Sequence, residues 1–257
     1  MDHILAVSLA TMQHDMQRLD RIALNLANVT TPGYRREVVA TRPFVEVLDQ
    51  AASSTQAQPE GSAAAAVAPG AAKSLLDVRP GTLRMTGESL DFAISGDAFF
   101  EIATPEGPAY TRQGNFSVDA RGRLVTAQGH AVMGKNGEVF LTTLKPVVDS
   151  FGNITEPLST SAVGGASTAQ LKVVRFENPA SMQRLGDGLL APGAGMVVAS
   201  ESDVQIRQGA LENANVSTVQ EMVQLMQTMR HFESMQKVAS GYDEMLGNAI
   251  RKLGELS

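Results

Sequence analysis

The chain has 257 residues, with 27 acidic and 21 basic side chains and a formal net charge of −6. This mild acidic excess disfavours nucleic acid and anionic lipid as the main partner, because both select for clustered Lys and Arg. The absence of cysteine excludes disulfides, zinc–thiolate and iron–sulfur sites and thiol catalysis. Because only 19% of the residues are charged, Gln, Asn, Ser, Thr and Ala must cover much of the surface.

The first segment, residues 2–29, repeats apolar side chains at steps of three and four residues. The mean period of 3.5 predicts a helix whose apolar seam belongs to a coiled coil. Pro32 and Gly33 follow it, and the residue before a proline disfavours the α conformation, so the helix is expected to end there. The N-terminus has no basic region ahead of an apolar run, and we therefore expect no cleaved signal peptide. The predicted seam consists of Leu5, Leu9, Met12, Met16, Leu19, Ala23 and Leu26.

The middle of the chain changes character twice. Residues 36–82 are predicted to form an extended connector, and within it residues 50–73 are rich in Ala, Ser, Gln and Pro, which is typical of a linker or mobile loop. From residue 83 to residue 209 the apolar period becomes two, and turn signals such as residues 119–122 interrupt it at short intervals. This pattern predicts a central domain of antiparallel strands.

The last segment, residues 217–256, returns to helical spacing, with Ser217 as a predicted N-cap and Gln220 completing a capping box. Neither terminal helix can bury its apolar stripe alone, so we expect the two to pair with each other or with neighbouring subunits. The predicted fold class is therefore α+β, with long N- and C-terminal helices forming a coiled-coil domain (residues 1–35 with 210–257) and a central antiparallel all-β domain. The C-terminal stripe comprises Met222, Leu225, Met229, Phe232, Met235, Val238, Tyr242, Met245, Ala249 and Leu253.

No residue pattern points to catalysis, a cofactor or a metal. The histidines His3, His14, His130 and His231 have no partner at metal-ligand spacing, and there is no HExxH pattern. Glycine pairs such as those in residues 186–188 are better explained as hairpin turns than as phosphate loops. We therefore predict that the protein is not an enzyme and has no cofactor. The methionines of the last helix indicate either an ordinary core or a pliable interface that tolerates non-identical contacts.

Three separated groups of residues carry a more specific signal. They are residues 25–34 (NLANVTTPGY); residues 90–100 (LDFAISGDAFF) with 110–116 (YTRQGNF) and 122–129 (GRLVTAQG); and residues 208–216 (QGALENANV) leading into 229–233 (MRHFE). Together they resemble the bacterial flagellar basal-body rod protein family, which belongs to the rod and hook group of axial proteins. The sequence RHFE at residues 230–233 looks more like the proximal-rod type than the distal-rod type.

This resemblance implies a structural subunit of the flagellar rod. Members of the family polymerise helically through their terminal helices and form a drive shaft and the wall of an export channel. The implied partners are copies of the chain, other rod and hook axial proteins and, during secretion, the flagellar type III export apparatus, without nucleic acid or membrane insertion. The implied location is the periplasm-spanning rod of the basal body.

The predicted assembly interface follows the apolar stripes of the two helices, and Asn25 and Asn28 are expected to satisfy backbone or neighbouring-subunit polar groups. Three alternatives stay open: a distal-rod or hook-type axial subunit, a cytosolic coiled-coil adaptor with a β recognition domain, and a β-domain enzyme with helical dimerisation arms. The enzyme would require a pocket with convergent acids or a metal. The predicted interface comprises Leu5, Leu9, Met12, Met16, Leu19, Asn25, Leu26, Asn28, Leu225, Met229, Phe232, Tyr242 and Leu253.

Overall fold

The computed structural model describes residues 2–39, 74–156, 169–199 and 204–254. The prediction of a linker at residues 50–73 lies outside these ranges. The chain divides into two units, which we call the helical unit (Met1–Leu24, Glu37–Leu75 and Val219–Ser257) and the β unit (Asn25–Arg36 and Leu76–Thr218). None of the helices described is both long and apolar enough to cross a membrane.

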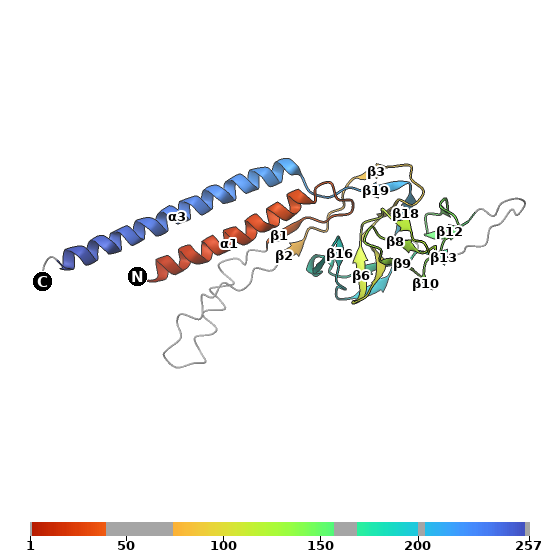
Figure 1. Ribbon diagram of the computed structural model, residues 1–257, viewed down its shortest axis with the longest axis horizontal. Coiled ribbons are helices and arrows are strands. Elements are labelled where there is room, and N and C mark those ends of the chain that lie inside the picture. The colour runs from red at the N-terminus through yellow and green to blue at the C-terminus, as the bar shows by residue number, and fades with distance from the viewer. Residues whose placement is uncertain (1, 40–73, 157–168, 200–203, 255–257) are drawn as a thin grey trace, which may run out of the picture. The chain divides into compact units, whose positions relative to one another are not determined.

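The helical unit contains α1 (Asp2–Ala27) and α3 (Thr218–Gly254), which lie side by side and run in opposite directions (Figure 1). Both predicted terminal helices are thus present, with ends within two residues of the expected positions. Their contact includes a hydrogen bond between Asp15 Oδ2 and His231 Nδ1 at 2.6 Å. An ion pair, Arg21 Nη1 to Glu37 Oε2 at 2.8 Å, ties α1 to the strand that begins at Glu37.

The coiled-coil part of the predicted fold class is wrong. The described residues contain one helix near each end of the chain, and the positions predicted for an apolar seam do not form one. Leu9 and Met16 are each 57% exposed, whereas the buried positions in the same stretch of α1 are Ser8, Asp15 and Ile22. The stripe of α1 that is least accessible is therefore partly polar, and it is rotated by one residue from the predicted seam. A coiled coil requires apolar side chains along its buried stripe, and Ser8 and Asp15 are polar.

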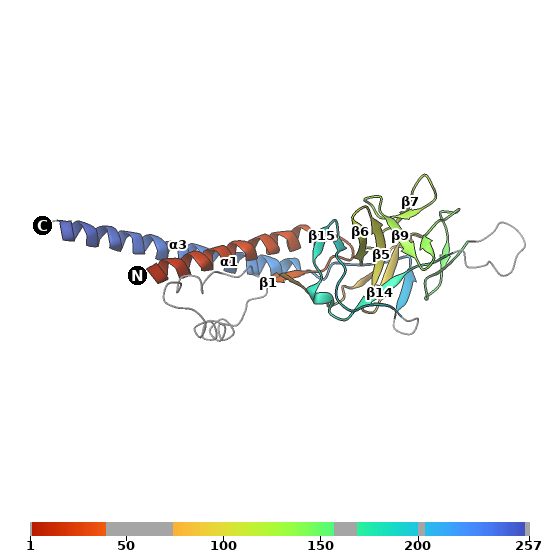
Figure 2. The same ribbon diagram turned by 90° about the horizontal axis from the view of Figure 1, so that it is seen from below.

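The β unit is built on one large sheet, whose central strands are seen in Figure 2. Its strand pairings are antiparallel within the described residues, as the alternating pattern predicts. The order along the main path is β15 (Arg184–Gly186), β16 (Leu189–Leu190), β6 (Gly107–Thr111), β5 (Phe99–Thr104), β9 (Ala131–Gly134), β8 (Leu124–Val125) and β7 (Ser117–Val118), with β10 (Gly137–Glu138) on β9, β14 (Val173–Phe176) on β5, and β17 (Met196–Val198) on β14.

The remaining strands of the described residues form smaller sheets. A 3₁₀ turn, η2 (Pro179–Ser181), follows β14. Two of the small sheets, β3–β19 and β18–β4, join strands from the two ends of the β unit and so bring its first and last segments together. The sheets are β11 (Val147–Val148) with β12 (Asn153–Thr155) and β13 (Ala169–Gln170); β18 (Gln205–Gln208) with β4 (Phe92–Ser95); β19 (Ala210–Glu212) with β3 (Leu83–Met85); and β1 (Glu37–Val39) with β2 (Ser74–Leu76).

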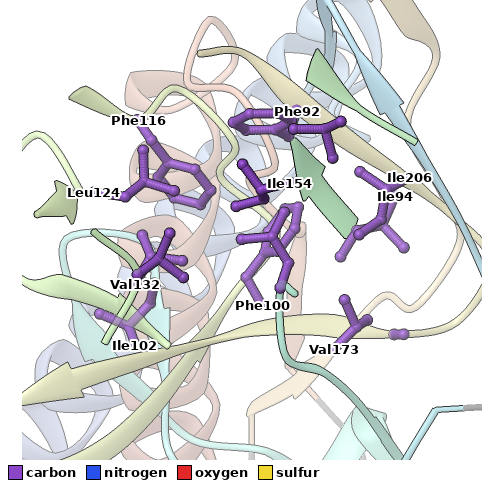
Figure 3. Close-up of a cluster of buried hydrophobic side chains, with 14 of the residues drawn as sticks. Phe92, Ile94, Phe100, Ile102, Phe116, Leu124, Val132, Ile154, Val173 and Ile206 are labelled. Atoms are coloured by element: carbon purple, nitrogen blue, oxygen red, sulfur yellow. The ribbon is translucent and has the colours of Figure 1, made fainter. Parts of the chain in front are cut away.

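The core of the β unit is a cluster of aliphatic side chains around three phenylalanines (Figure 3). Phe100 is fully buried, and its ring meets that of Phe116 edge-on, with 5.3 Å between the centroids. The ring of Phe92 also lies near that of Phe116, with 6.1 Å between the centroids. Strands from distant parts of the sequence supply these side chains, and their shared burial holds the sheets together.

Candidate functional site

Residues from three of the motif segments, 25–34, 110–116 and 208–216, meet in one polar cluster within the β unit, together with Arg35 and Gly81. We call this cluster the junction and define it by the side chains and backbone groups that meet there. It contains residues from the end of α1 and from the end of β19. The junction comprises Asn25, Gly33, Tyr34, Arg35, Gly81, Arg112, Glu212 and Asn215.

Glu212 is the centre of the junction. Its Oε1 lies 2.9 Å from Nη2 of Arg35, and its Oε2 lies 2.9 Å from Nε of Arg112. All three side chains are buried. Arg112 also donates to the carbonyl oxygen of Gly96 at 2.8 Å and to that of Ala98. Two guanidinium groups thus share one carboxylate, and backbone carbonyls accept further donors, as buried charges require.

Gly33 and Gly81 allow the backbone to pass close to Glu212. The amide of Gly33 donates to the carbonyl oxygen of Glu212 at 2.7 Å, and the amide of Gly81 donates to Glu212 Oε1 at 2.8 Å. Gly33 has φ +66°, and a Cβ there would overlap the backbone of Arg112. A Cβ on Gly81 would overlap the carbonyl oxygen of Asn213. Glycine is needed at both positions because the chain passes too close for any side chain.

Asn215 extends the junction beyond Glu212. Its Oδ1 accepts from the amide of Arg36 at 2.6 Å, and its Nδ2 donates to the carbonyl oxygens of Asp77 at 2.9 Å and Arg79 at 2.8 Å. Its own amide donates to the carbonyl oxygen of Tyr34 at 3.2 Å. One residue therefore links three chain segments.

The end of α1 is fixed to the same cluster through an aromatic side chain. The hydroxyl of Tyr34 donates to Oδ1 of Asn25 at 3.2 Å, and both residues are buried. The guanidinium of Arg184 lies over the Tyr34 ring, 4.2 Å from its centroid, and donates to the carbonyl oxygen of Arg35 at 2.7 Å. The cation–π contact and the hydrogen bonds together hold the Tyr34 side chain in place.

Burial lowers the pKa of the Arg112 guanidinium to about 10, and the charge of Glu212 opposes this shift. Burial likewise lowers the pKa of Arg35, again against the charge of Glu212. With a pKa of about 10, Arg112 remains protonated at neutral pH. The junction has fixed charges and buried donors, an arrangement that is suited to holding chain segments together and not to moving protons. Among the residues described, no group of three or more His, Asp or Glu side chains could hold a metal ion.

The predicted interface residues differ in how far the structure buries them. Asn25 is buried in the junction, and Asn28 accepts a hydrogen bond from the Thr31 hydroxyl at 3.2 Å. Leu9, Met16 and Met229 are about half exposed. The predictions for Leu5 and Leu253 concern side chains outside the described set. The remaining residues are partly buried: Met12, Leu19, Leu26, Leu225, Phe232 and Tyr242.

Sequence reasoning missed Arg35, Arg112 and Glu212 as a cluster. Arg112 and Glu212 lie inside the motifs, but they are 100 residues apart, and no local pattern couples them. The available signal was the occurrence of Gly, Asn and one charged residue within each of the short segments 110–116 and 208–216 of the strand region. Such residues within a strand region indicate close backbone approaches and buried polar contacts.

Comparisons with known proteins give matches along the whole chain. A family model described as "Flagellar basal body rod FlgEFG protein C-terminal" matches residues 207–252, and one described as "Flagellar hook protein FlgE/F/G D1 domain" matches residues 93–164. A flagellar basal-body rod protein FlgF of Rhizobium meliloti is 32% identical, over 97% of this chain and 97% of the relative. FlgF of Salmonella typhimurium is 31% identical over 98% and 99%, and FlgG of Bacillus subtilis is 29% identical over 93% and 94%.

Proposed function

The chain belongs to the family of flagellar basal-body rod proteins, and from this premise we propose that it is a structural subunit of the rod that assembles with other axial flagellar proteins. Its relatives are named as rod proteins and not as enzymes. It accordingly acts in the basal body. The proximal-rod type, which RHFE at residues 230–233 favours, fits relatives named FlgF and FlgG.

The observation that carries the assembly proposal is the apolar surface of the two helices. Leu9 and Met16 on α1 and Met222, Met226 and Met229 on α3 are each about half exposed. Isolated apolar side chains on a surface are ordinary, but a helix with several at helical spacing indicates a contact surface. Covering such stripes with neighbouring copies, by one repeated heterologous contact, produces a helical assembly.

The predicted interface residues belong to this proposal. Leu9, Met16 and Met229 present apolar area to neighbouring subunits, while Asn25 and Asn28 position the end of α1. Copies of the chain and other rod and hook axial proteins are the proposed neighbours. The flagellar type III export apparatus is the proposed route to the rod, because a long chain without cysteine suits passage through a narrow channel into an oxidising compartment.

The test replaces one exposed apolar side chain and uses its neighbour as the control. In the host bacterium, Met16→Asp should abolish motility and remove the protein from purified basal bodies, because the new charge lies where an apolar contact is expected. Gln17→Asp adds the same charge at the adjacent exposed position and should retain both. The purified Met16→Asp protein should keep the β unit folded by circular dichroism.

The result also separates the alternatives. Wild-type motility with intact basal bodies in Met16→Asp cells would contradict the proposed interface. Recovery of the wild-type protein only from the cytosol, and never with basal bodies, would favour a cytosolic adaptor and contradict the rod assignment.

A further inference from the structure

The junction joins segments that are unusually distant in sequence. Arg35 donates to the carbonyl oxygen of Arg79, 44 residues away, and Arg112 pairs with Glu212 across 100 residues. The amide of Arg36 and the side chain of Asn215 are separated by 179 residues. Contacts of this kind require long loops to close before any of them is formed.

The C-terminal segment, residues 210–215, supplies a partner to each residue of the N-terminal segment from 33 to 36. Gly33 donates to the Glu212 carbonyl oxygen, and Tyr34 accepts from the Asn215 amide. Arg35 pairs with the Glu212 carboxylate, and Arg36 donates to the Asn215 side chain. The N-terminal segment therefore has a contact with residues 210–215 at every position.

The segment that contains Gly81 depends on the same residues. Its amide donates to Glu212, and β3, which follows it, pairs with β19 through Leu83 and Glu212. The carbonyl oxygens of Asp77 and Arg79 accept from Asn215. Without residues 210–215, Arg35 and Arg112 would also be buried without their carboxylate, and an unpaired buried charge strongly destabilises the folded state.

We propose that Glu212 and Asn215 are closing residues: the segments 33–36 and 77–82 become ordered only when residues 210–215 join them. The core around Phe100 forms from strands between these segments and does not use the Glu212 carboxylate. The β unit thus folds in two stages, a core stage and a closing stage. Because the chain is synthesised from its N-terminus, residues 33–36 become ordered only after their partner segment, about 180 residues further along the chain, has been synthesised. This inference does not depend on the proposed function.

Hydrogen exchange with mass spectrometry on the full-length protein tests the proposal. In Glu212→Gln, amides of residues 33–36 and 77–82 should exchange at least tenfold faster than in the wild type, while peptides that contain Phe100 and Val132 keep their protection. Glu138→Gln is the matched control, because Glu138 is an exposed glutamate whose ion pair with Arg123 is 3.5 Å long. It should leave both regions unchanged.

Asn215→Ala is the second variant, because it removes side-chain hydrogen bonds without leaving a buried arginine unpaired. If Glu212→Gln loses protection everywhere, selective fast exchange at residues 33–36 in Asn215→Ala supports the proposal. Unchanged protection of residues 33–36 in both variants, or equal loss in the core in both, would overturn it.

The order of the two stages has its own readout. During refolding of the wild-type protein from urea, pulse labelling should show the core peptides protected first. The amides of residues 33–36 and 210–215 should gain protection together and later. Protection of residues 33–36 before residues 210–215 would contradict the proposed closing stage.

Discussion

The β unit and the terminal helices treat apolar side chains in opposite ways. In the β unit, Phe100 and Val132 are completely buried among residues from several strands. On the helices, Leu9, Met16 and Met245 are each more than half exposed, and buried positions include Asp15, Glu221 and Thr228. The β unit has a buried apolar core of its own, whereas the helices keep apolar side chains exposed.

The difference explains how one chain can be both a stable body and part of an assembly. Burial of apolar area within the β unit supplies its stability. The helices contact each other but leave apolar side chains such as Leu9 and Met16 exposed, and a helix with an uncovered apolar stripe is marginal in water. Their stability should therefore come from neighbouring subunits, and substitutions in each region can test this contrast.

The largest effect is expected in the core of the β unit. Phe100→Ala removes a fully buried ring that meets Phe116 edge-on, and it should lower the free energy of unfolding by about 3–5 kcal/mol. Urea denaturation followed by circular dichroism measures this. A loss below about 1 kcal/mol would show that the core is less tightly packed than the structure indicates.

The next effect is expected at the junction. Arg112→Met removes one of the two guanidinium groups from Glu212 and frees two carbonyl oxygens, and it should cost about 2–3 kcal/mol. Arg123→Met is the control, because Arg123 pairs with Asp119 at the surface, where an ion pair contributes about 0–1 kcal/mol. Equal losses of unfolding free energy in the two variants would show that the buried ion pair of Arg112 contributes no more than the surface ion pair of Arg123.

A smaller effect is expected from acid. The Arg79 guanidinium, which hydrogen-bonds to the Asp77 carboxyl, lowers the pKa of Asp77 below its ordinary value. The ionised form therefore stabilises the folded state above the unfolded pKa, and this contribution is lost as the pH falls through the folded pKa. Unfolding measured from about pH 6 to about pH 2 should show less acid destabilisation in Asp77→Asn than in the wild type. An identical pH dependence would contradict this role of Asp77.

The smallest effect is expected on the helices. Met16→Ala should change the free energy of unfolding of the dilute protein by less than about 0.5 kcal/mol, because the side chain is 57% exposed. In the same sample, amides of α1 should exchange far faster than those near Phe100. Full protection of the amides of residues 8–26 from hydrogen exchange in a dilute monomer would show that the helices are as stable as the β unit.

The sequence predicts local elements of this protein well. The helical spacing places both terminal helices within two residues of their observed ends, and the turn at residues 119–122 lies between β7 and β8 as expected. These features depend on neighbouring residues alone. The seam was mispredicted because α1 has apolar side chains on more than one face, and spacing does not distinguish Met12, which is partly buried, from Met16, which is exposed.

The junction could not be predicted for a different reason. The motifs mark the residues that build it, but the pairing of Arg112 with Glu212 and the contact of Gly33 with the same residue depend on the path of the whole chain between them. Resemblance to a family therefore located the important residues without revealing that they are neighbours. Asn25 was expected to satisfy a polar group near the helix end, and its partner is Tyr34.

The hydrogen bond between Gly33 and Glu212 has an architectural consequence. It joins the segment that follows α1 to the segment that precedes α3, with 2.7 Å between the Gly33 amide nitrogen and the Glu212 carbonyl oxygen. Because this contact holds the two segments together, surface loops of the β unit that lie between them in the sequence can gain or lose length without separating the segments that continue to α1 and α3.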